Sequence, residues 1–283
     1  MKRNIMVIGA HAGDIEARAG GTLSKYRADG YDGCYVVLTN SNSGLYLDAS
    51  GTARRRWSEE MRVVRQRQVE TAAGCFGLKP LILGYKEISY TARDGSVLYP
   101  DVATRSFGAD EPVGRIPLAL APQVILTGRP CSGQDPAPLM QELVDLLCAW
   151  EPEVTIIQEQ DLNPDHCAAF LLLVRAFVLA ASKAAPGELF CSILYPAPGP
   201  YFSQRIDVAA AHKVVDVSGQ VDTLTQALRA FEPERAPCAG TVEDNLRRRA
   251  PWGAVVRGTH GEVFARLTSG AQIRHLGLTA YLG

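Results

Sequence analysis

The feature that most constrains this chain is the regular alternation of short apolar segments with helix-like stretches. Segments rich in valine, isoleucine and leucine occur at residues 4–9, 35–39, 81–84, 154–158 and 214–217. Helix-like stretches occupy residues 14–29, 53–76, 138–150, 168–182, 220–231 and 245–266. Apolar strands separated by helices are typical of a parallel sheet that is covered on both faces. We therefore expect an α/β fold with a Rossmann-like, doubly wound and mostly parallel sheet.

The length of the chain fits one domain of this kind, which we place at residues 1–283. Residues 86–135 contain several prolines and glycines and show little helical spacing, so we expect a loop-rich insertion there. Loops at the ends of strands often carry specificity in such folds. We therefore expect this insertion to cover the site that is described below.

Charge and cysteine content argue against several classes of function. Lysine and arginine number 29 against 30 aspartates and glutamates, so there is no basic field to hold nucleic acid or an anionic membrane. The seven cysteines are odd in number and widely spaced, as expected for reduced core residues. The N-terminal apolar run is too short for a signal peptide, and the longest apolar stretch, residues 168–181, is too short for a membrane span. The sequence predicts a cytoplasmic protein that binds neither nucleic acid nor a membrane.

Two polar clusters each follow a predicted strand. His11 and Asp14 come after the first strand, at a spacing that lets both side chains converge at the start of a helix, and His166 comes after the strand at residues 154–158. Ligands of open parallel sheets bind outside the carboxyl ends of the strands. Two imidazoles and one carboxylate form the three-ligand set of a catalytic zinc site, with the fourth position left for water. A histidine in such a loop is more often solvent-facing or hydrogen-bonded, so spacing alone leaves both interpretations open.

Longer motifs resemble those of one known family. The run VIGAHAGDIEARAGGTL at residues 7–23 resembles the opening motif of the PIG-L/LmbE family of metal-dependent de-N-acetylases, in which Ala-His-Pro-Asp-Asp is followed by Glu and Gly-Gly-Thr-Leu. The segments RQVE at residues 67–70, NPDH at 163–166 and GEVF at 261–264 resemble the family's Arg-x-x-Glu, His-Pro-Asp-His and Ala-Glu-Ala-Phe motifs. The resemblance runs over most of the chain in the right order. It implies a hydrolase that removes the acetyl group from an N-acetylated sugar of the GlcNAc type.

The resemblance also implies which residues form the site. It assigns His11, Asp14 and His166 as ligands of Zn²⁺, with another divalent metal such as Fe²⁺ as the alternative. It assigns Arg67 as a residue that contacts the substrate. The expected partner is a small N-acylated sugar or a related amide, and a homo-oligomer is compatible with the sequence.

Two positions depart from the family's motif. Gly13 stands in place of the general base, and Asn163 stands in place of the histidine that stabilises the tetrahedral intermediate. Asn163 can still donate a hydrogen bond, and Asp165 is expected to orient a ligand imidazole or to act as a substitute base. Asn163 and Asp165 are therefore the candidate catalytic residues. The alternative function is a metal-binding or sugar-binding homologue without catalytic activity, which the two departures favour.

Several other polar residues have a structural interpretation that is favoured over a functional one. Glu159 is expected to be a solvated loop residue, with a role as a base as the alternative. The arginine runs at residues 54–56 and 247–249 are expected to be solvated, with binding of an anionic substrate as the alternative, and His212, His260 and His275 are expected to be structural.

Overall fold

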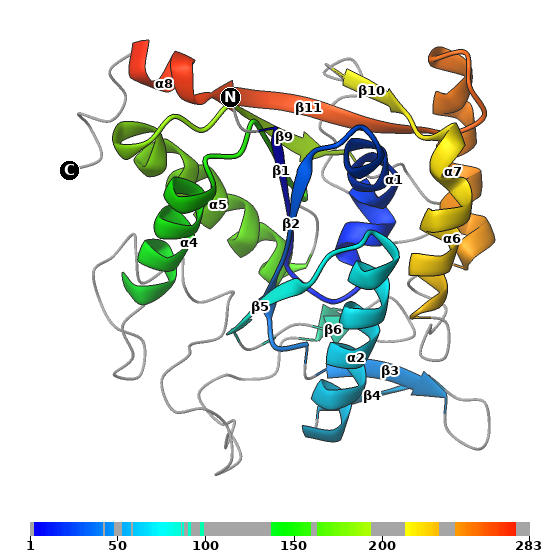
Figure 1. The fold of residues 1–283 in the computed structure, drawn as a ribbon. Helices are drawn as coiled ribbons and strands as arrows, with labels where there is room; N and C mark the ends of the chain where they lie inside the picture. Colours follow the sequence, from blue (N-terminus) through cyan, green and yellow to red (C-terminus); the bar gives the residue numbers. More distant parts are fainter. Residues whose placement is uncertain are drawn as a thin grey trace.

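A seven-stranded sheet runs through the molecule, with helices on both of its faces (Figure 1). The computed structural model describes residues 3–41, 43–47, 53–57, 59–85, 87, 90–91, 97–98, 137–159, 163–193, 213–231 and 241–275. The strands are β1 (Asn4–Gly9), β2 (Asp32–Thr39), β3 (Ser43–Leu47), β4 (Ala53–Trp57), β5 (Pro80–Tyr85), β6 (Tyr90–Thr91), β7 (Val97–Leu98), β8 (Val154–Ile157), β9 (Glu188–Ser192), β10 (Lys213–Asp216) and β11 (Gly261–Ser269). The helices are α1 (Asp14–Ala28), α2 (Glu59–Cys75), α4 (Ala137–Trp150), α5 (Pro164–Lys183), the short 3₁₀ helix η3 (Ser218–Gln220), α6 (Val221–Arg229), α7 (Val242–Val255) and α8 (Gly270–His275).

The order of strands across the sheet is that of a doubly wound fold. It reads β10-β11-β9-β8-β1-β2-β5, and the five strands from β9 to β5 are parallel. Only β11 runs against its neighbours β9 and β10. The chain places β2 and β5 on one side of β1 and β8 and β9 on the other, so the order reverses between β1 and β8. This arrangement confirms the predicted α/β fold with a mostly parallel sheet.

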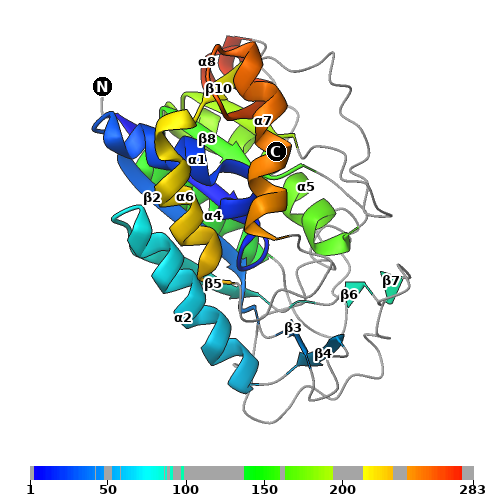
Figure 2. The ribbon, with the colours of Figure 1, turned by 90° about the vertical axis from the view of Figure 1, so that its right-hand side faces the viewer.

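The sheet separates two hydrophobic cores because side chains alternate along a strand. Met6 and Ile8 of β1 face the core beneath α4 and α5, whereas Ile5 and Val7 face the core beneath α1, α2 and α6. Figures 1 and 2 show these two groups of helices on opposite faces. All six residues of β1 are buried, which explains why its sequence is almost continuously apolar.

Helix α5 is the most apolar helix that borders the site. In the described part of the chain, Asp165–Lys183 is long and apolar enough to cross a membrane by length and composition alone. Phe177 and Ala180 of this helix are fully buried in the core beneath α4 and α5. These contacts are those of a core helix packed on a sheet.

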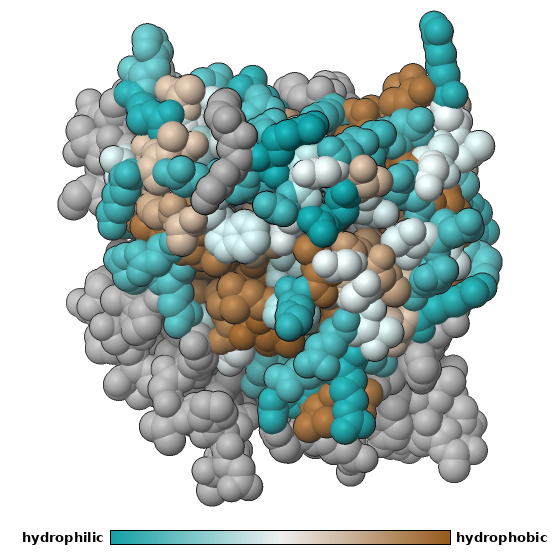
Figure 3. All heavy atoms as spheres, in the orientation of Figure 1, coloured by the Kyte–Doolittle hydropathy of each residue, from teal (hydrophilic) through white to brown (hydrophobic). Residues whose placement is uncertain are grey.

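One edge of the sheet leaves apolar side chains at the surface. Figure 3 shows a mostly hydrophilic face with a hydrophobic area near its middle, over the edge strand β5. Leu81 of β5 is 40% exposed. Single exposed leucines are common on soluble proteins, so this area by itself identifies no partner.

The helix predicted at residues 245–266 is wrong. Helix α7 ends at Val255, and β11 starts at Gly261. The helix stops because Arg257 has a φ of 59°, while Gly258 N donates to the Gly253 carbonyl at 2.8 Å. This is a Schellman ending with arginine where glycine is usual, so the sequence carried no ordinary stop signal.

The helix predicted at residues 53–76 is also wrong over its first part. Ala53–Trp57 forms β4, which pairs in antiparallel fashion with β3, and α2 begins only at Glu59. Pairing with a distant strand decides such a segment, and local spacing does not reveal it. The prediction also missed β9, and it began the helix at residue 168 where α5 begins at Pro164.

Most of the expected insertion at residues 86–135 lies outside the described residues. Only Glu87 and the backbone of β6 and β7 are described within it. That this segment covers the site therefore stays a prediction.

Candidate metal centre

The loop after β1 is fixed to its neighbours through its backbone. Ala10 N donates to Gln158 Oε1 at 2.8 Å, and the Ala10 carbonyl accepts from Thr39 N at 3.0 Å. Ala12 N donates to Ser41 Oγ at 3.1 Å. These bonds come from the ends of β2 and β8, the two strands beside β1. The loop is therefore held at the carboxyl end of the sheet, at the point where the strand order reverses.

A tight turn brings His11 and Asp14 together. Gly13 has a φ of 93° and a ψ of −13°, a left-handed conformation that favours glycine. The turn lets His11 N donate to Asp14 Oδ2 at 2.7 Å. As a result, the carboxylate lies beside the imidazole of its own loop.

Helix α5 delivers the second histidine. Asn163 Oδ1 accepts from Asp165 N at 2.9 Å and caps the helix, and Pro164 follows at its first position. Asp165 and His166 thus lie in the first turn of α5 and not in the polar loop that the sequence suggested. Both are buried, with Asp165 at 0% exposure.

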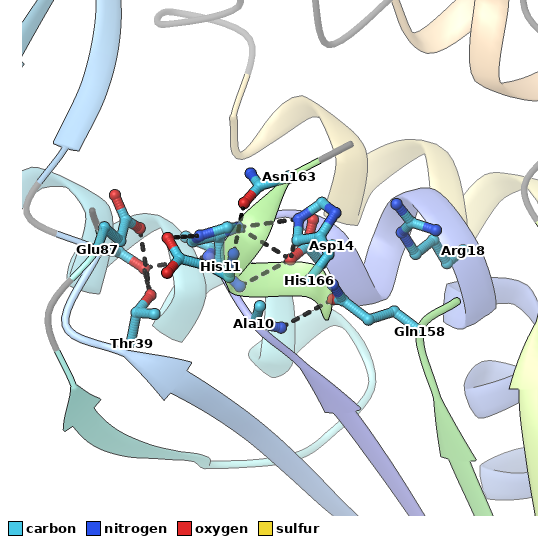
Figure 4. Close-up of polar contacts among 12 residues, drawn as sticks. Ala10, His11, Asp14, Arg18, Thr39, Glu87, Gln158, Asn163 and His166 are labelled. Atoms are coloured by element: carbon cyan, nitrogen blue, oxygen red, sulfur yellow. Dashed lines mark hydrogen bonds and ion pairs between the residues drawn. The ribbon is translucent and has the colours of Figure 1, made fainter. Parts of the chain in front are cut away.

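Three side chains from these two segments point toward one another (Figure 4). His11 Nδ1 lies 3.0 Å from His166 Nε2, and Asp14 Oδ2 lies 3.4 Å from each of these nitrogens. Ligands about 2.0–2.1 Å from a tetrahedral metal ion lie roughly 3.3 Å apart. The donor types and their separations therefore fit a divalent metal, and these three residues form the group able to hold one in the described part of the chain.

Asp165 contacts the outer nitrogen of one ligand. Its Oδ2 lies 3.1 Å from His11 Nε2. A carboxylate that accepts a hydrogen bond from the second ring nitrogen fixes the tautomer and the direction of a metal-binding histidine. The arrangement leaves His11 Nδ1 for the metal.

Charge around the cluster favours a cation. Burial of the His11 imidazole lowers its pKa, but the carboxylates of Glu87, Asp14 and Asp165 outweigh burial and hold the pKa well above 6.5. Burial raises the pKa of Asp14, but His166 and His11 outweigh it and hold the pKa well below 3.8. A proton on the imidazole here occupies the place that a metal ion would take.

Sequence reasoning missed the other charged groups of the site. Glu87 is buried and accepts a hydrogen bond from Thr39 Oγ1 at 3.2 Å. Figure 4 shows both residues on the side of His11 away from His166. Because Glu87 follows a different strand within an irregular segment, no spacing in the sequence connects it with His11.

Glu159 was expected to be solvated, and this is wrong. It is fully buried and lies 3.5 Å from Nη1 of Arg18, one helical turn after Asp14. The prediction failed because Glu159 follows β8 at the buried end of the sheet.

The other residues that the sequence singled out lie in several parts of the fold. Arg67 lies in α2 with an exposed side chain, and no bond joins this side chain to the metal-ligand cluster within the described residues. His260 lies beside Thr259, His275 is exposed at the end of α8, and His212 lies outside the described residues. The arginine run at residues 247–249 is solvated only in part, because Arg249 is 2% exposed and paired with Glu262.

Comparisons with known proteins agree with the fold and the motifs. A sequence model of the PIG-L family, described as GlcNAc-PI de-N-acetylase, matches residues 6–177, which is more than half of the chain. A comparison with curated proteins found no significant match.

Several solved structures share the fold at low sequence identity. N,N'-diacetylchitobiose deacetylase from Pyrococcus horikoshii, in complex with an inhibitor, is 15% identical with a TM-score of 0.61 over 95% of this chain and 85% of that chain. The zinc-inhibited form of teicoplanin deacetylase is 12% identical with a TM-score of 0.61 over 94% and 98%. A 4-carboxy-2-hydroxymuconate hydratase from Pseudomonas putida KT2440 is 14% identical with a TM-score of 0.60 over 94% and 96%. At these identities the likeness concerns the fold alone.

Proposed function

Because the chain belongs to the PIG-L family, whose model is described as GlcNAc-PI de-N-acetylase, we propose that it is a metal-dependent hydrolase of an N-acylated sugar or a related amide. The bond cleaved would be the carbon–nitrogen bond of the amide, with release of the acyl group as a carboxylate.

One observation carries this proposal. His11 Nδ1, Asp14 Oδ2 and His166 Nε2 lie 3.0–3.4 Å apart at the carboxyl ends of β1 and β8. These distances match those between ligands that share one tetrahedral metal ion. The set of two imidazoles and one carboxylate suits Zn²⁺, and Fe²⁺ is the alternative.

The protein residues would divide the work around this point. A divalent metal, when bound here, would polarise the amide carbonyl and lower the pKa of a water molecule. Asp165 would hold His11 by accepting a hydrogen bond from its Nε2–H group. Asn163 Oδ1 caps α5. The amide NH2 group at Nδ2 is therefore the part of this side chain able to donate a hydrogen bond to a substrate oxygen.

The proton-transfer arrangement differs from that of the family's motif. Gly13 has no side chain to accept a proton, and Asp165 is already directed at His11. A general base is worth about 10²–10⁴ in rate. We therefore propose weak hydrolysis of simple N-acetylglucosamine substrates. The same departure is what favours the alternative function, a metal-binding or sugar-binding homologue without turnover.

Metal analysis followed by an acetate-release assay tests the proposal. The wild type should contain about one divalent ion per chain, as expected for a three-ligand site. His11→Ala and His166→Ala should lose it, together with any release of acetate from N-acetyl sugars. Equal metal content in these variants would refute the site, whereas bound metal and sugar without acetate release would favour the alternative. The cytoplasmic location and the homo-oligomer stay predictions from the sequence.

A further inference from the structure

A buried ion pair joins two C-terminal elements, α7 and β11. Arg249 of α7 and Glu262 of β11 are 2% and 1% exposed. Arg249 Nε donates to Glu262 Oε1 at 2.8 Å, and Arg249 Nη2 lies 2.8 Å from the same oxygen. Both residues lie beyond residues 6–177, where the family's sequence model matches. Buried charges persist where they are paired and hydrogen-bonded, so the further partners of this pair show what it holds.

The carboxylate of Glu262 binds the backbone of α1. Gly21 N donates to Glu262 Oε1 at 3.0 Å, and Thr22 N donates to Oε2 at 2.7 Å. The close approach needs glycine, because a Cβ at Gly21 would lie 2.8 Å from Cβ of Val217 and 3.1 Å from Glu262 Oε1. The Glu262 carboxylate is therefore in direct contact with the backbone of α1.

The guanidinium of Arg249 binds the same helix nearer to its start. Nη2 donates to the carbonyl oxygens of Glu16 and Ala17, at 2.9 Å in both cases. Nη1 donates to the carbonyl oxygen of Asn245 in its own helix at 3.0 Å. Glu16 is two residues from Asp14. The ion pair therefore binds the part of α1 that directly follows this proposed metal ligand.

We propose that Arg249 and Glu262 are positioning residues, which fix the first turn of α1 and thereby hold the Asp14 carboxylate among the metal ligands. The inference rests on the proposed metal function. Apolar residues of α1 such as Ile15 pack against the sheet, but apolar attraction is non-directional. Hydrogen bonds to the helix backbone fix both its rotation and its position along its axis, and a ligand carboxylate must be held within about 0.5 Å.

Arg249→Lys tests this role. Lysine keeps a positive charge beside Glu262, but a single ammonium replaces the planar fork that reaches the carboxylate and the α1 carbonyl groups together. Val263→Ala is the matched control, because Val263 is the next residue of β11, is 1% exposed and packs in a separate cluster with Ile193. Each variant is checked for folding by near-UV circular dichroism. It is then titrated with Zn²⁺ against a competing chelator, and the absorption spectrum of its Co²⁺ form is recorded.

We expect Arg249→Lys to bind Zn²⁺ about tenfold more weakly or worse, in the range seen when groups that orient ligands are lost. Its Co²⁺ spectrum should change, while Val263→Ala keeps the wild-type affinity and spectrum. Unchanged affinity and spectrum in folded Arg249→Lys would overturn the inference, and so would an equal loss in the control.

Glu262→Gln replaces Arg249→Lys if the lysine variant does not fold, since glutamine keeps one of the two acceptor oxygens. Failure of both variants to fold would overturn the inference, because the pair would then serve the fold and not the site. The wild type separates the two proposals. If it binds no metal, or if His11→Ala binds equally well, the proposed function itself fails.

Discussion

Replacing Gly13 with aspartate would return a carboxylate to the position of the family's general base. The φ of 93° at Gly13 lies in the left-handed region, where a side chain costs about 1 kcal/mol and aspartate is among the better tolerated residues. A Cβ at Gly13 would lie 3.8 Å from the Phe231 ring, which is an ordinary contact. We therefore expect Gly13→Asp to fold, with a free energy of unfolding lower by about 1 kcal/mol and a Tm lower by about 2 °C.

The Phe231 ring would also affect the pKa of the new carboxyl group. An apolar neighbour disfavours the charged form, so it raises the pKa of a carboxyl group toward the range where a general base works near neutral pH. A well-placed base is worth about 10²–10⁴ in rate, and a carboxylate in a strained turn recovers part of this. The expected result is a gain of at least about tenfold in kcat/KM for acetate release from an N-acetyl sugar.

Gly13→Asn is the matched control, because asparagine has the shape of aspartate and the same backbone cost but is no base. Metal content is measured for both variants. Asn163 is left unchanged, since it caps α5 and its loss would add a separate effect. Equal rates for the two variants, with one metal ion per chain in each, would refute the reasoning and show that another group accepts the proton.

Three further outcomes follow from the same geometry. Asp165→Asn should weaken metal binding about 10- to 100-fold, because asparagine orients His11 less well than a carboxylate; chelator competition measures this. Asn163→Ala should lower the free energy of unfolding by about 1 kcal/mol in denaturant titrations, with metal content unchanged, because it removes the cap of α5. In metal-free protein the raised pKa of His11 gives stability that is fully present below pH 6.5 and is lost as the pH rises through that raised value. Chelator-treated wild type should therefore lose Tm over this range, and a His11→Gln variant should not.

The central strands could be predicted because burial on both faces leaves a clear record in the sequence. The apolar segments at residues 4–9 and 154–158 contain β1 and β8, and the helix spacing after each strand implied parallel pairing. No comparable sequence pattern indicates that β4 pairs with β3, or that Arg257 adopts the left-handed conformation that ends α7. Both depend on contacts or conformations that local spacing does not specify.

The three residues of the metal-ligand cluster could be grouped from the sequence for a related reason. His11, Asp14 and His166 follow strands whose carboxyl ends meet at one edge, so knowing the fold was enough to group them. Glu87 and the pair Arg18–Glu159 were not found, because only the folded chain brings these buried charges beside the cluster. The sequence thus grouped the three candidate ligands but not the charges that surround them.

The separation of the two histidines along the chain has a consequence for when the proposed metal site can form. His11 and His166 are 155 residues apart and become neighbours only when β8 docks against β1. Closing so long a loop costs entropy and makes such a pairing a slow step. During synthesis, β1, α1, β2 and β5 leave the ribosome well before α5 does. The early part of the chain therefore lacks His166 and could not form the complete three-ligand site. If the proposed metal function is right, metal uptake would therefore be a late event in maturation, and a chain that holds the ion would already have completed the centre of its sheet.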